Sequence, residues 1–332
     1  MAEGLLDRYD ALLFDLDGTV YRGGQALPAA ADVVDAAHAR GTAVRFVTNN
    51  ASRAPGAVAE HLRAMSVSAD TAEVSTSGQA AAAVLSERLA DGDRVLVLGT
   101  EALADLVAEV GLTPVRAFSD EVKGVVQGLS PQMTWADLAE GALAIRAGAL
   151  WVACNVDRTL PTERGLLPGN GSMVHALRVA TDQEPVVAGK PATPLMRQSI
   201  ESAGAGRPLV VGDRLDTDIE GAVSSGVDSL LVLTGVCTPE GLLRAGEHER
   251  PTYVLADLTG FDGPADAMRV GSGDGWEVEV DGNTVRVDGS GDPTALLRAL
   301  CPAHWSAAGS LTHDARSAAA RTALTTLGLA IG

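Results

Sequence analysis

Short apolar runs recur along the chain, separated by turn residues or by helical patterns. The runs at residues 11–14, 42–47 and 208–211 each end in a polar stretch. Apolar runs of this length, bounded by turn signals, are typical of strands buried in a parallel sheet. Apolar residues at helical spacing occur near residues 28–41, 55–65 and 193–203. The alternation of strands and helices predicts an α/β fold.

A second series of strand and helix patterns lies between residues 94 and 154. It predicts strands at 95–98, 124–127 and 150–154, and helices at 101–110 and 134–147, with Thr134 as the N-cap of the second helix. None of the motifs described below lies within this βαβαβ series, so we interpret it as an inserted domain. A turn-rich segment follows at residues 155–172 and predicts a positioned surface loop.

The end of the chain has a different pattern. Residues 276–280 and 284–287 alternate apolar and polar residues around the turn Asp281-Gly282-Asn283, which predicts a hairpin. Helical patterns follow near residues 293–304 and 314–329. We expect a packed C-terminal α+β segment, in which His304 and His313 are structural or surface residues.

Composition narrows the functional classes. The 332 residues carry a formal net charge of −18, which argues against a general nucleic-acid binder and against binding to an anionic membrane. The three cysteines are far apart and form no CxxC, so neither a disulfide framework nor a zinc site is indicated. No signal peptide and no membrane-length apolar stretch is visible. We therefore expect a cytoplasmic protein.

Two carboxylates mark the end of the first apolar run. Asp15 and Asp17 follow it and lead into Gly18, and the carboxyl edge of a parallel sheet is where open α/β folds bind ligands. Asp213 follows the run at 208–211 in the same way, so we expect it to meet Asp15 at that edge. Neighbouring carboxylates repel one another unless a cation compensates them, and Mg²⁺ prefers oxygen ligands.

Groups suited to an anion lie at two further strand ends. Thr48 and Asn49 end the run at 42–47, and Lys190 sits in a Gly-Lys-Pro turn after residues 185–188. A hydroxyl, an amide and a lysine can bind phosphate together with backbone N–H groups. Helix capping is the alternative for Asn49. Asp218 lies near a helix start, where a carboxylate is favourable in any case.

These stretches occur in the order of the four motifs of the haloacid dehalogenase (HAD) superfamily. They resemble most closely the NagD-like, p-nitrophenylphosphatase-like branch with a C2-type cap, over residues 8–258. The stretches are Asp15-Leu16-Asp17-Gly18-Thr19, Thr48-Asn49-Asn50, Lys190, and Gly212-Asp213 with Thr217-Asp218-Ile219. Asn155 and Asp157 resemble the cap loop of that branch, and Arg158 and Arg164 lie where this loop would face a substrate.

The resemblance implies a Rossmann-like HAD core with an inserted C2 cap. We expect core segments at 1–85 and 185–261, a cap at 86–184, and an accessory segment at 262–332. A homo-oligomer could form through the cap or the accessory segment.

The resemblance also implies a Mg²⁺-dependent phosphomonoesterase. Asp15 would be the nucleophile that forms an aspartyl-phosphate, and Asp17 the general acid and base. Asp15, Asp17 and Asp213 would hold the metal, with Asp218 and Gly18 behind them. Thr48, Asn49 and Lys190 would bind the phosphate.

The substrate stays open. We expect a small phosphorylated metabolite, glycerol 3-phosphate or a similar polyol phosphate. The alternatives are phosphoglycolate, a nucleotide or pyridoxal phosphate. A phosphotransferase or phosphomutase, and a non-catalytic sugar-phosphate sensor, are further alternatives.

Overall fold

The computed structural model describes residues 3–162 and 164–331. Contacts divide the chain into two units, Met1–Val44 with Gly204–Gly332, and Arg45–Ala203. Each unit is described by itself. The predicted boundaries at residues 85, 184 and 261 stay a prediction.

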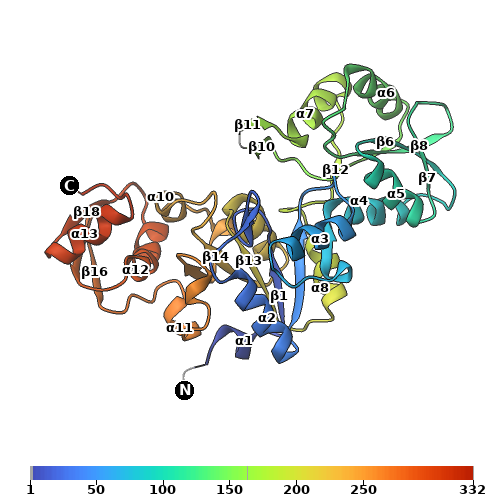
Figure 1. Ribbon diagram of the computed structural model, residues 1–332. Coiled ribbons are helices and arrows are strands. Elements are labelled where there is room, and N and C mark those ends of the chain that lie inside the picture. The colour runs from blue at the N-terminus through green and yellow to red at the C-terminus, as the bar shows by residue number, and fades with distance from the viewer. Residues whose placement is uncertain (1–2, 163, 332) are drawn as a thin grey trace. The chain divides into compact units, whose positions relative to one another are not determined.

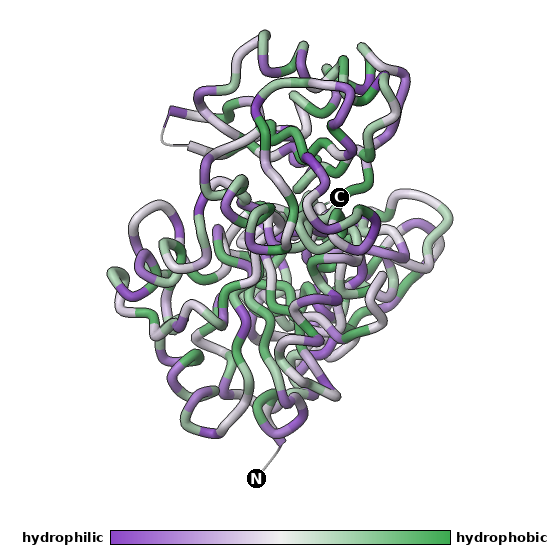
Figure 2. The backbone as a smooth tube through the Cα atoms, turned by 90° about the vertical axis from the view of Figure 1, so that its right-hand side faces the viewer, coloured by the Kyte–Doolittle hydropathy of each residue, from purple (hydrophilic) through white to green (hydrophobic). Residues whose placement is uncertain are grey.

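The first unit is built on parallel strands that pair in the order β15-β14-β13-β1. These strands are β1 (Ala11–Phe14), β13 (Pro208–Gly212), β14 (Asp228–Val232) and β15 (Tyr253–Leu255). Every residue of β1 and β13 is buried, which is why both appear in the sequence as unbroken apolar runs. Figure 2 shows hydrophobic and hydrophilic stretches alternating along the backbone. The predicted α/β class is confirmed.

Short elements complete this part of the first unit. The helices are α1 (Leu5–Arg8), α2 (Ala30–Arg40), α9 (Glu220–Ser224) and α10 (Pro239–Leu243), and β2 (Tyr21–Arg22) pairs with β3 (Gln25–Ala26). Single turns of 3₁₀ helix lie at η3 (Glu247–Glu249) and η4 (Leu258–Gly260), and a π-helical turn at η2 (Leu215–Ile219). The π-helical turn begins two residues after Asp213 and carries Asp218.

The C-terminal segment adds a sheet in the order β16-β17-β18. Its elements are α11 (Ala265–Met268), β16 (Trp276–Asp281), β17 (Thr284–Gly289), α12 (Pro293–Ser306), β18 (Thr312–Ala315) and α13 (Ala318–Thr326) (Figure 1). The predicted hairpin is confirmed, since β16 and β17 pair in antiparallel fashion. One hydrophobic cluster joins Leu296 and Leu324 of this segment to Leu231 and Val254 of the parallel strands. The segment is therefore packed on the core.

The predicted helix at 314–329 is wrong at its start. Residues 312–315 form β18, which pairs in parallel with β17, and the helix begins only at Ala318. The Ser317 hydroxyl caps it by accepting a hydrogen bond from the Ala320 N–H at 3.1 Å. The strand β18 has only four residues, and it pairs with a strand that precedes α12 in the chain. So short a strand shows little periodicity in the sequence.

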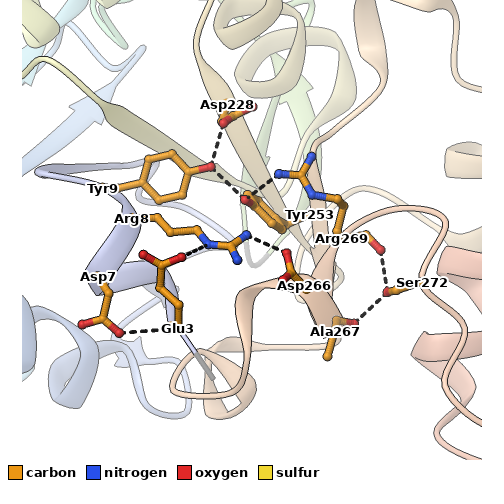
Figure 3. A network of polar contacts seen from close by, with 11 residues as sticks. Glu3, Asp7, Arg8, Tyr9, Asp228, Tyr253, Asp266, Ala267, Arg269 and Ser272 are labelled. Atoms are coloured by element: carbon orange, nitrogen blue, oxygen red, sulfur yellow. Dashed lines mark hydrogen bonds and ion pairs between the residues drawn. The ribbon is translucent and has the colours of Figure 1, made fainter. Parts of the chain in front are cut away.

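A polar network joins the N-terminal residues to the segment that follows β15 (Figure 3). The Tyr9 hydroxyl donates to Asp228 Oδ2 at 2.7 Å and lies 2.9 Å from the Tyr253 hydroxyl. Arg269 donates to the Tyr253 hydroxyl at 3.1 Å, and Arg8 pairs with Asp266 at 2.8 Å. Burial, followed by the bonds to Tyr253 and Asp228, raises the pKa of Tyr9. The hydroxyl therefore stays protonated and able to donate.

The second unit contains two sets of parallel strands. The first set is β4 (Ala43–Thr48), which begins just before the unit boundary, and β5 (Val74–Thr76). Around them lie α3 (Pro55–Ala64), the 3₁₀ turn η1 (Thr71–Glu73), α4 (Ser77–Ser86) and α8 (Thr193–Ala203). The Thr76 hydroxyl caps α4 by accepting from the Gln79 N–H at 3.2 Å, so this polar stretch is both strand and cap.

The second set forms a sheet in the order β12-β9-β8-β6-β7. Its strands are β6 (Arg94–Leu98), β7 (Thr113–Val115), β8 (Val122–Gln127), β9 (Leu150–Ala153) and β12 (Val186–Val187). Its helices are α5 (Glu101–Glu109), α6 (Trp135–Arg146) and α7 (Asn170–Thr181). Thr134 caps α6 as predicted, with its hydroxyl accepting from the Asp137 N–H. The strand predicted near residues 185–188 is the edge strand β12 of this sheet.

The turn-rich segment after β9 is more ordered than a loop. Its residues form a hairpin of β10 (Thr159–Thr162) and β11 (Gly165–Pro168). The side chains of β11 are exposed, so no alternation of buried and exposed positions marks this strand in the sequence.

Candidate active site

Three carboxylates come together at the carboxyl end of the first unit's strands. Asp15 follows β1, Asp213 follows β13, and Asp218 lies in η2. Strands β1 and β13 pair side by side in parallel, with Phe14 opposite Val211, so their next residues meet at one edge. One oxygen of each carboxylate lies within 4.8 Å of the others. Asp213 and Asp218 are buried and Asp15 is partly exposed.

Backbone N–H groups orient two of these carboxylates. The Val236 N–H donates to Asp213 Oδ2 at 2.6 Å, and the Arg214 N–H donates to Asp218 Oδ2 at 3.1 Å. Hydrogen bonds of this kind favour the charged form of a carboxylate and fix its direction. Three oriented carboxylates within a few ångströms form the hard oxygen donor set that suits Mg²⁺. The residues present therefore fit this metal.

Glycines allow the chain to approach Asp213 closely. Gly18 has φ +94°, and a Cβ there would lie 2.7 Å from Asp213 Oδ2. A Cβ at Gly235 would lie 1.8 Å from the same oxygen. The Thr234 hydroxyl donates to the Gly18 carbonyl at 2.5 Å and joins the two loops. Sequence reasoning found Gly18 but missed Thr234 and Gly235, because their approach to Asp213 is not local.

Asp17 lies beside this group on the turn after β1. Its side chain is exposed, and its Oδ2 accepts a hydrogen bond from the Tyr21 hydroxyl at 3.3 Å. The turn is closed by the Gly18 N–H, which donates to the Tyr21 carbonyl at 2.8 Å. The sequence analysis assigns no role to Tyr21, although it lies only four residues after Asp17. Asp216 points elsewhere and pairs with Arg214 at 2.8 Å.

The second unit contains the predicted phosphate-binding residues. Lys190 is 2% exposed, and its Nζ donates to the Val47 carbonyl at 2.9 Å. Thr48 is also buried, and its hydroxyl accepts from the Asn50 N–H at 3.1 Å. The Asn49 side chain contacts the backbone of Lys190. The structure therefore brings Thr48, Asn49 and Lys190 into one group.

The predicted cap-loop residues divide into two pairs. Asn155 is buried and donates to the Asn49 carbonyl at 2.7 Å, and Asp157 contacts the Asn49 side chain. Arg158 and Arg164 are exposed, before β10 and in the turn between β10 and β11. Asn155 and Asp157 thus join the Lys190 group, whereas the arginines lie on the hairpin.

Residues 12–113 match the family described as haloacid dehalogenase-like hydrolase, and residues 187–261 match the related family described as HAD-hydrolase-like. The chain is 48% identical to the D-glycerol 3-phosphate phosphatase of Mycobacterium tuberculosis over 94% of this chain and 90% of that protein. The chain belongs to the haloacid dehalogenase-like hydrolases. It is also 39% identical to the 5'-nucleotidase YutF of Bacillus subtilis, over 76% of this chain and 96% of that protein.

A solved structure of this hydrolase family extends the comparison to the metal. The glycerol phosphate phosphatase of Mycobacterium tuberculosis in complex with magnesium superimposes with a TM-score of 0.93 at 48% identity, covering 99% of this chain and 100% of that one. The same protein has been solved with calcium. These relatives confirm the predicted family, the Rossmann-like core, the phosphatase class and Mg²⁺ as the cofactor.

The C-terminal segment separates this HAD hydrolase from its shorter relatives. Residues 273–329 match a family described as GCN5-related N-acetyltransferase like domain. The mycobacterial phosphatase is matched over nearly the whole chain, whereas the nucleotidase covers only 76% of it. The hydrolase family matches end at residue 261, so the segment lies outside them, as expected from a resemblance that covers residues 8–258. Among the described residues, no helix is long and apolar enough to cross a membrane.

Proposed function

We propose that this protein is a Mg²⁺-dependent phosphomonoesterase that hydrolyses glycerol 3-phosphate. The main support is the group formed by Asp15, Asp213 and Asp218, whose oxygens lie within 4.8 Å of one another. The substrate follows from the D-glycerol 3-phosphate phosphatase that is 48% identical over 94% of the chain. Other relatives are named 5'-nucleotidase and acid sugar phosphatase, and they match less of the chain.

In the proposed reaction, Asp15 is the nucleophile. One of its carboxylate oxygens attacks the phosphorus atom, the bond from phosphorus to the ester oxygen breaks, and an aspartyl-phosphate forms. Asp17 gives its proton to the departing alkoxide, which becomes glycerol. The Tyr21 hydroxyl donates to Asp17 and holds this exposed side chain on its turn. Proton transfer of this kind contributes typically ~10²–10⁴-fold to a rate.

In the second half of the reaction, Asp17 accepts a proton from a water molecule that attacks the phosphorus. The bond between phosphorus and the Asp15 oxygen then breaks, inorganic phosphate leaves, and Asp15 is restored. Asp15, Asp213, the Asp17 backbone carbonyl and Asp218 behind them would hold Mg²⁺, which when bound neutralises charge on the phosphoryl oxygens. Lys190 and Thr48 are the proposed phosphate-binding side chains.

The proposed setting is the cytoplasm, with a free metabolite as the ligand and no nucleic acid. A net charge of −18 supports this part of the proposal.

We also propose that the protein self-associates through the second unit. Trp135 and Leu143 of α6 and Val179 of α7 are exposed apolar side chains that suit a contact between copies. Size-exclusion chromatography coupled to light scattering tests the proposed self-association. A monomer at micromolar concentration would contradict it.

The test of the activity is phosphate release from a panel of metabolites, with Mg²⁺ and with EDTA. The panel contains glycerol 3-phosphate, phosphoglycolate, a nucleoside monophosphate and pyridoxal phosphate. We expect the highest kcat/KM for glycerol 3-phosphate, dependence on Mg²⁺, and no turnover by Asp15→Asn. Preference for another member of the panel would replace the substrate while leaving the phosphatase class in place. Release that needs an added acceptor would indicate a phosphotransferase.

A further inference from the structure

The side chain of Asn49 is committed to the backbone of Lys190. Its Oδ1 accepts from the Lys190 N–H at 2.8 Å, and its Nδ2 donates to the Lys190 carbonyl at 3.0 Å. One amide thus pairs with both polar groups of a single residue, which is 141 positions away in the sequence. Two hydrogen bonds to one peptide segment fix both its distance and its direction.

The turn that carries Lys190 is built for this contact. A Cβ at Gly189 would lie 2.6 Å from Asn49 Oδ1 and 2.4 Å from the Cys154 carbonyl oxygen. Only glycine lets the turn come this near to both groups. The Lys190 side chain then returns to the same strand end, where its Nζ donates to the Val47 carbonyl. Lys190 is therefore tied to the end of β4 through its backbone and through its side chain.

Asn49 also contacts the segment that follows β9. Its Nδ2 lies 3.3 Å from Asp157 Oδ2, and its backbone carbonyl accepts from Asn155 Nδ2 at 2.7 Å. Asn155 in turn accepts from the Asp157 N–H at 3.2 Å, and Asn170 donates to the Asn155 carbonyl at 2.7 Å. The end of β4, the Lys190 turn and residues 155–157 thus meet at Asn49.

These contacts use both donor hydrogens of the Asn49 side-chain amide. The two Nδ2 hydrogens serve the Lys190 carbonyl and Asp157, and Oδ1 serves the Lys190 N–H. A phosphate contact through this side chain would require breaking one of these bonds. The sequence interpretation of Asn49 as a phosphate ligand is therefore less suited to this geometry than a role in holding Lys190.

We propose that Asn49 is a positioning residue that sets the backbone of Lys190 and couples it to Asp157. The consequence for catalysis rests on the proposed function, in which Lys190 binds the phosphoryl group. Misplacing a catalytic group by about 1 Å can cost on the order of 10²-fold in rate. We therefore expect Asn49→Ala to lower kcat by about 10- to 100-fold and to change KM much less.

The first measurement is hydrogen exchange without substrate, on peptides that cover residues 189–192. Asn49→Ala removes the acceptor of the Lys190 N–H, so exchange there should become faster, while peptides of β8 and β9 keep their protection. The matched control is Asn50→Ala. Asn50 is the next residue, is exposed, and its Oδ1 accepts from the Ser52 N–H at 2.9 Å. We expect this control to exchange like the wild type at residues 189–192.

The second measurement uses an exchange of partners. Asn49→Asp keeps an acceptor for the Lys190 N–H, but it loses the donor to the Lys190 carbonyl and places a second carboxylate against Asp157. We therefore expect activity at or below that of Asn49→Ala. Adding Asp157→Asn restores a donor opposite the new carboxylate, and should recover part of the lost kcat. If Asn49 acted by touching phosphate, the added negative charge would repel the substrate, and Asp157→Asn could not restore turnover.

Unchanged exchange at residues 189–192 in Asn49→Ala would overturn the proposal, and so would a double variant no more active than Asn49→Asp. If Asn49→Ala does not fold, the nearly isosteric Asn49→Asp and its double variant still decide the question. A wild type that hydrolyses nothing on the panel would remove the proposed function, yet the exchange result would still show whether Asn49 holds Lys190.

Discussion

Neutralising Asp213 should stabilise the protein when no metal is present. Asp213 is fully buried, and one of its oxygens lies within 4.8 Å of oxygens from Asp15 and Asp218. Replacing it by Asn keeps the shape of the side chain and an acceptor for the Val236 N–H. The substitution removes one of three negative charges that repel one another.

The separation sets the size of the effect. Two unit charges at the upper limit of this separation, 4.8 Å, repel by roughly 3.5 kcal/mol at the effective dielectric constant of 20 that describes protein sites. The substitution removes two repulsions, that of Asp213 with Asp15 and that of Asp213 with Asp218, which together amount to roughly 7 kcal/mol. Because Asp15 is partly exposed, screening by water lowers this gain to about 3.5 kcal/mol. The bond from Val236 weakens by about 1 kcal/mol when its acceptor loses charge. We expect a net gain of about 2.5 kcal/mol and a melting temperature higher by a few degrees.

The assay is thermal unfolding in EDTA and over a Mg²⁺ titration. Metal that binds only the folded state stabilises it, by about 2.7 kcal/mol at a hundred times Kd. We expect this gain in the wild type and little of it in Asp213→Asn, which should also lose turnover. Asp216→Asn is the control, because it removes the same charge three residues away from a side chain paired with Arg214.

Three results would refute this reasoning. Asp213→Asn could be less stable than the wild type in EDTA, which would mean that repulsion within the group is not significant. The variant could instead gain as much from Mg²⁺ as the wild type, which would place the metal elsewhere. An equal gain in stability in Asp216→Asn would show that the effect comes from the lower net charge of the protein and not from repulsion among the three carboxylates.

Two further predictions concern stability. Tyr9→Phe removes the bond from a buried hydroxyl to Asp228 and the contact with Tyr253, and should cost about 1.5–3 kcal/mol in urea unfolding; a loss below 0.5 kcal/mol, the lower end for an ordinary hydrogen bond, would contradict it. Burial and the neighbouring His313 lower the pKa of His304 from 6.5 to about 4. The unfolded chain then binds more protons than the folded one between these values, so stability is complete above pH 6.5 and falls toward pH 4. A His304→Asn variant should lose less stability than the wild type between pH 6.5 and pH 4. Equal slopes of melting temperature against pH in the two proteins would show that His304 does not cause this loss.

Much of the carboxylate group is predictable from sequence. The strands β1 and β13 are buried on both faces, so they appear as unbroken apolar runs, and the residues that follow them must share one edge. This places Asp15 beside Asp213 without any structure. For Asp218 the sequence allows two interpretations, helix stabilisation or the metal site. Only the fold shows that its oxygen lies within 4.8 Å of those of Asp15 and Asp213.

The rest depends on contacts between residues far apart in the chain. Asn49 precedes a helix, and its local pattern fits a cap or an anion site, whereas its actual partner is Lys190, 141 positions away. In the sequence, nothing distinguishes Gly235 from other loop glycines. In the fold it lies so close to Asp213 that a Cβ would not fit. The strand β18 has only four residues, and its pairing with β17 gives no local period.

The central claim is that Asp15 becomes covalently phosphorylated during turnover. The direct measurement is an acid quench of the Mg²⁺-loaded enzyme turning over glycerol 3-phosphate, followed by mass spectrometry of the tryptic peptide of residues 9–22. We predict a fraction of this peptide that carries one phosphoryl group on Asp15, absent with EDTA and absent in Asp15→Asn. A peptide that stays unmodified while phosphate is released, or a phosphoryl group found on Asp17 instead, would contradict the account.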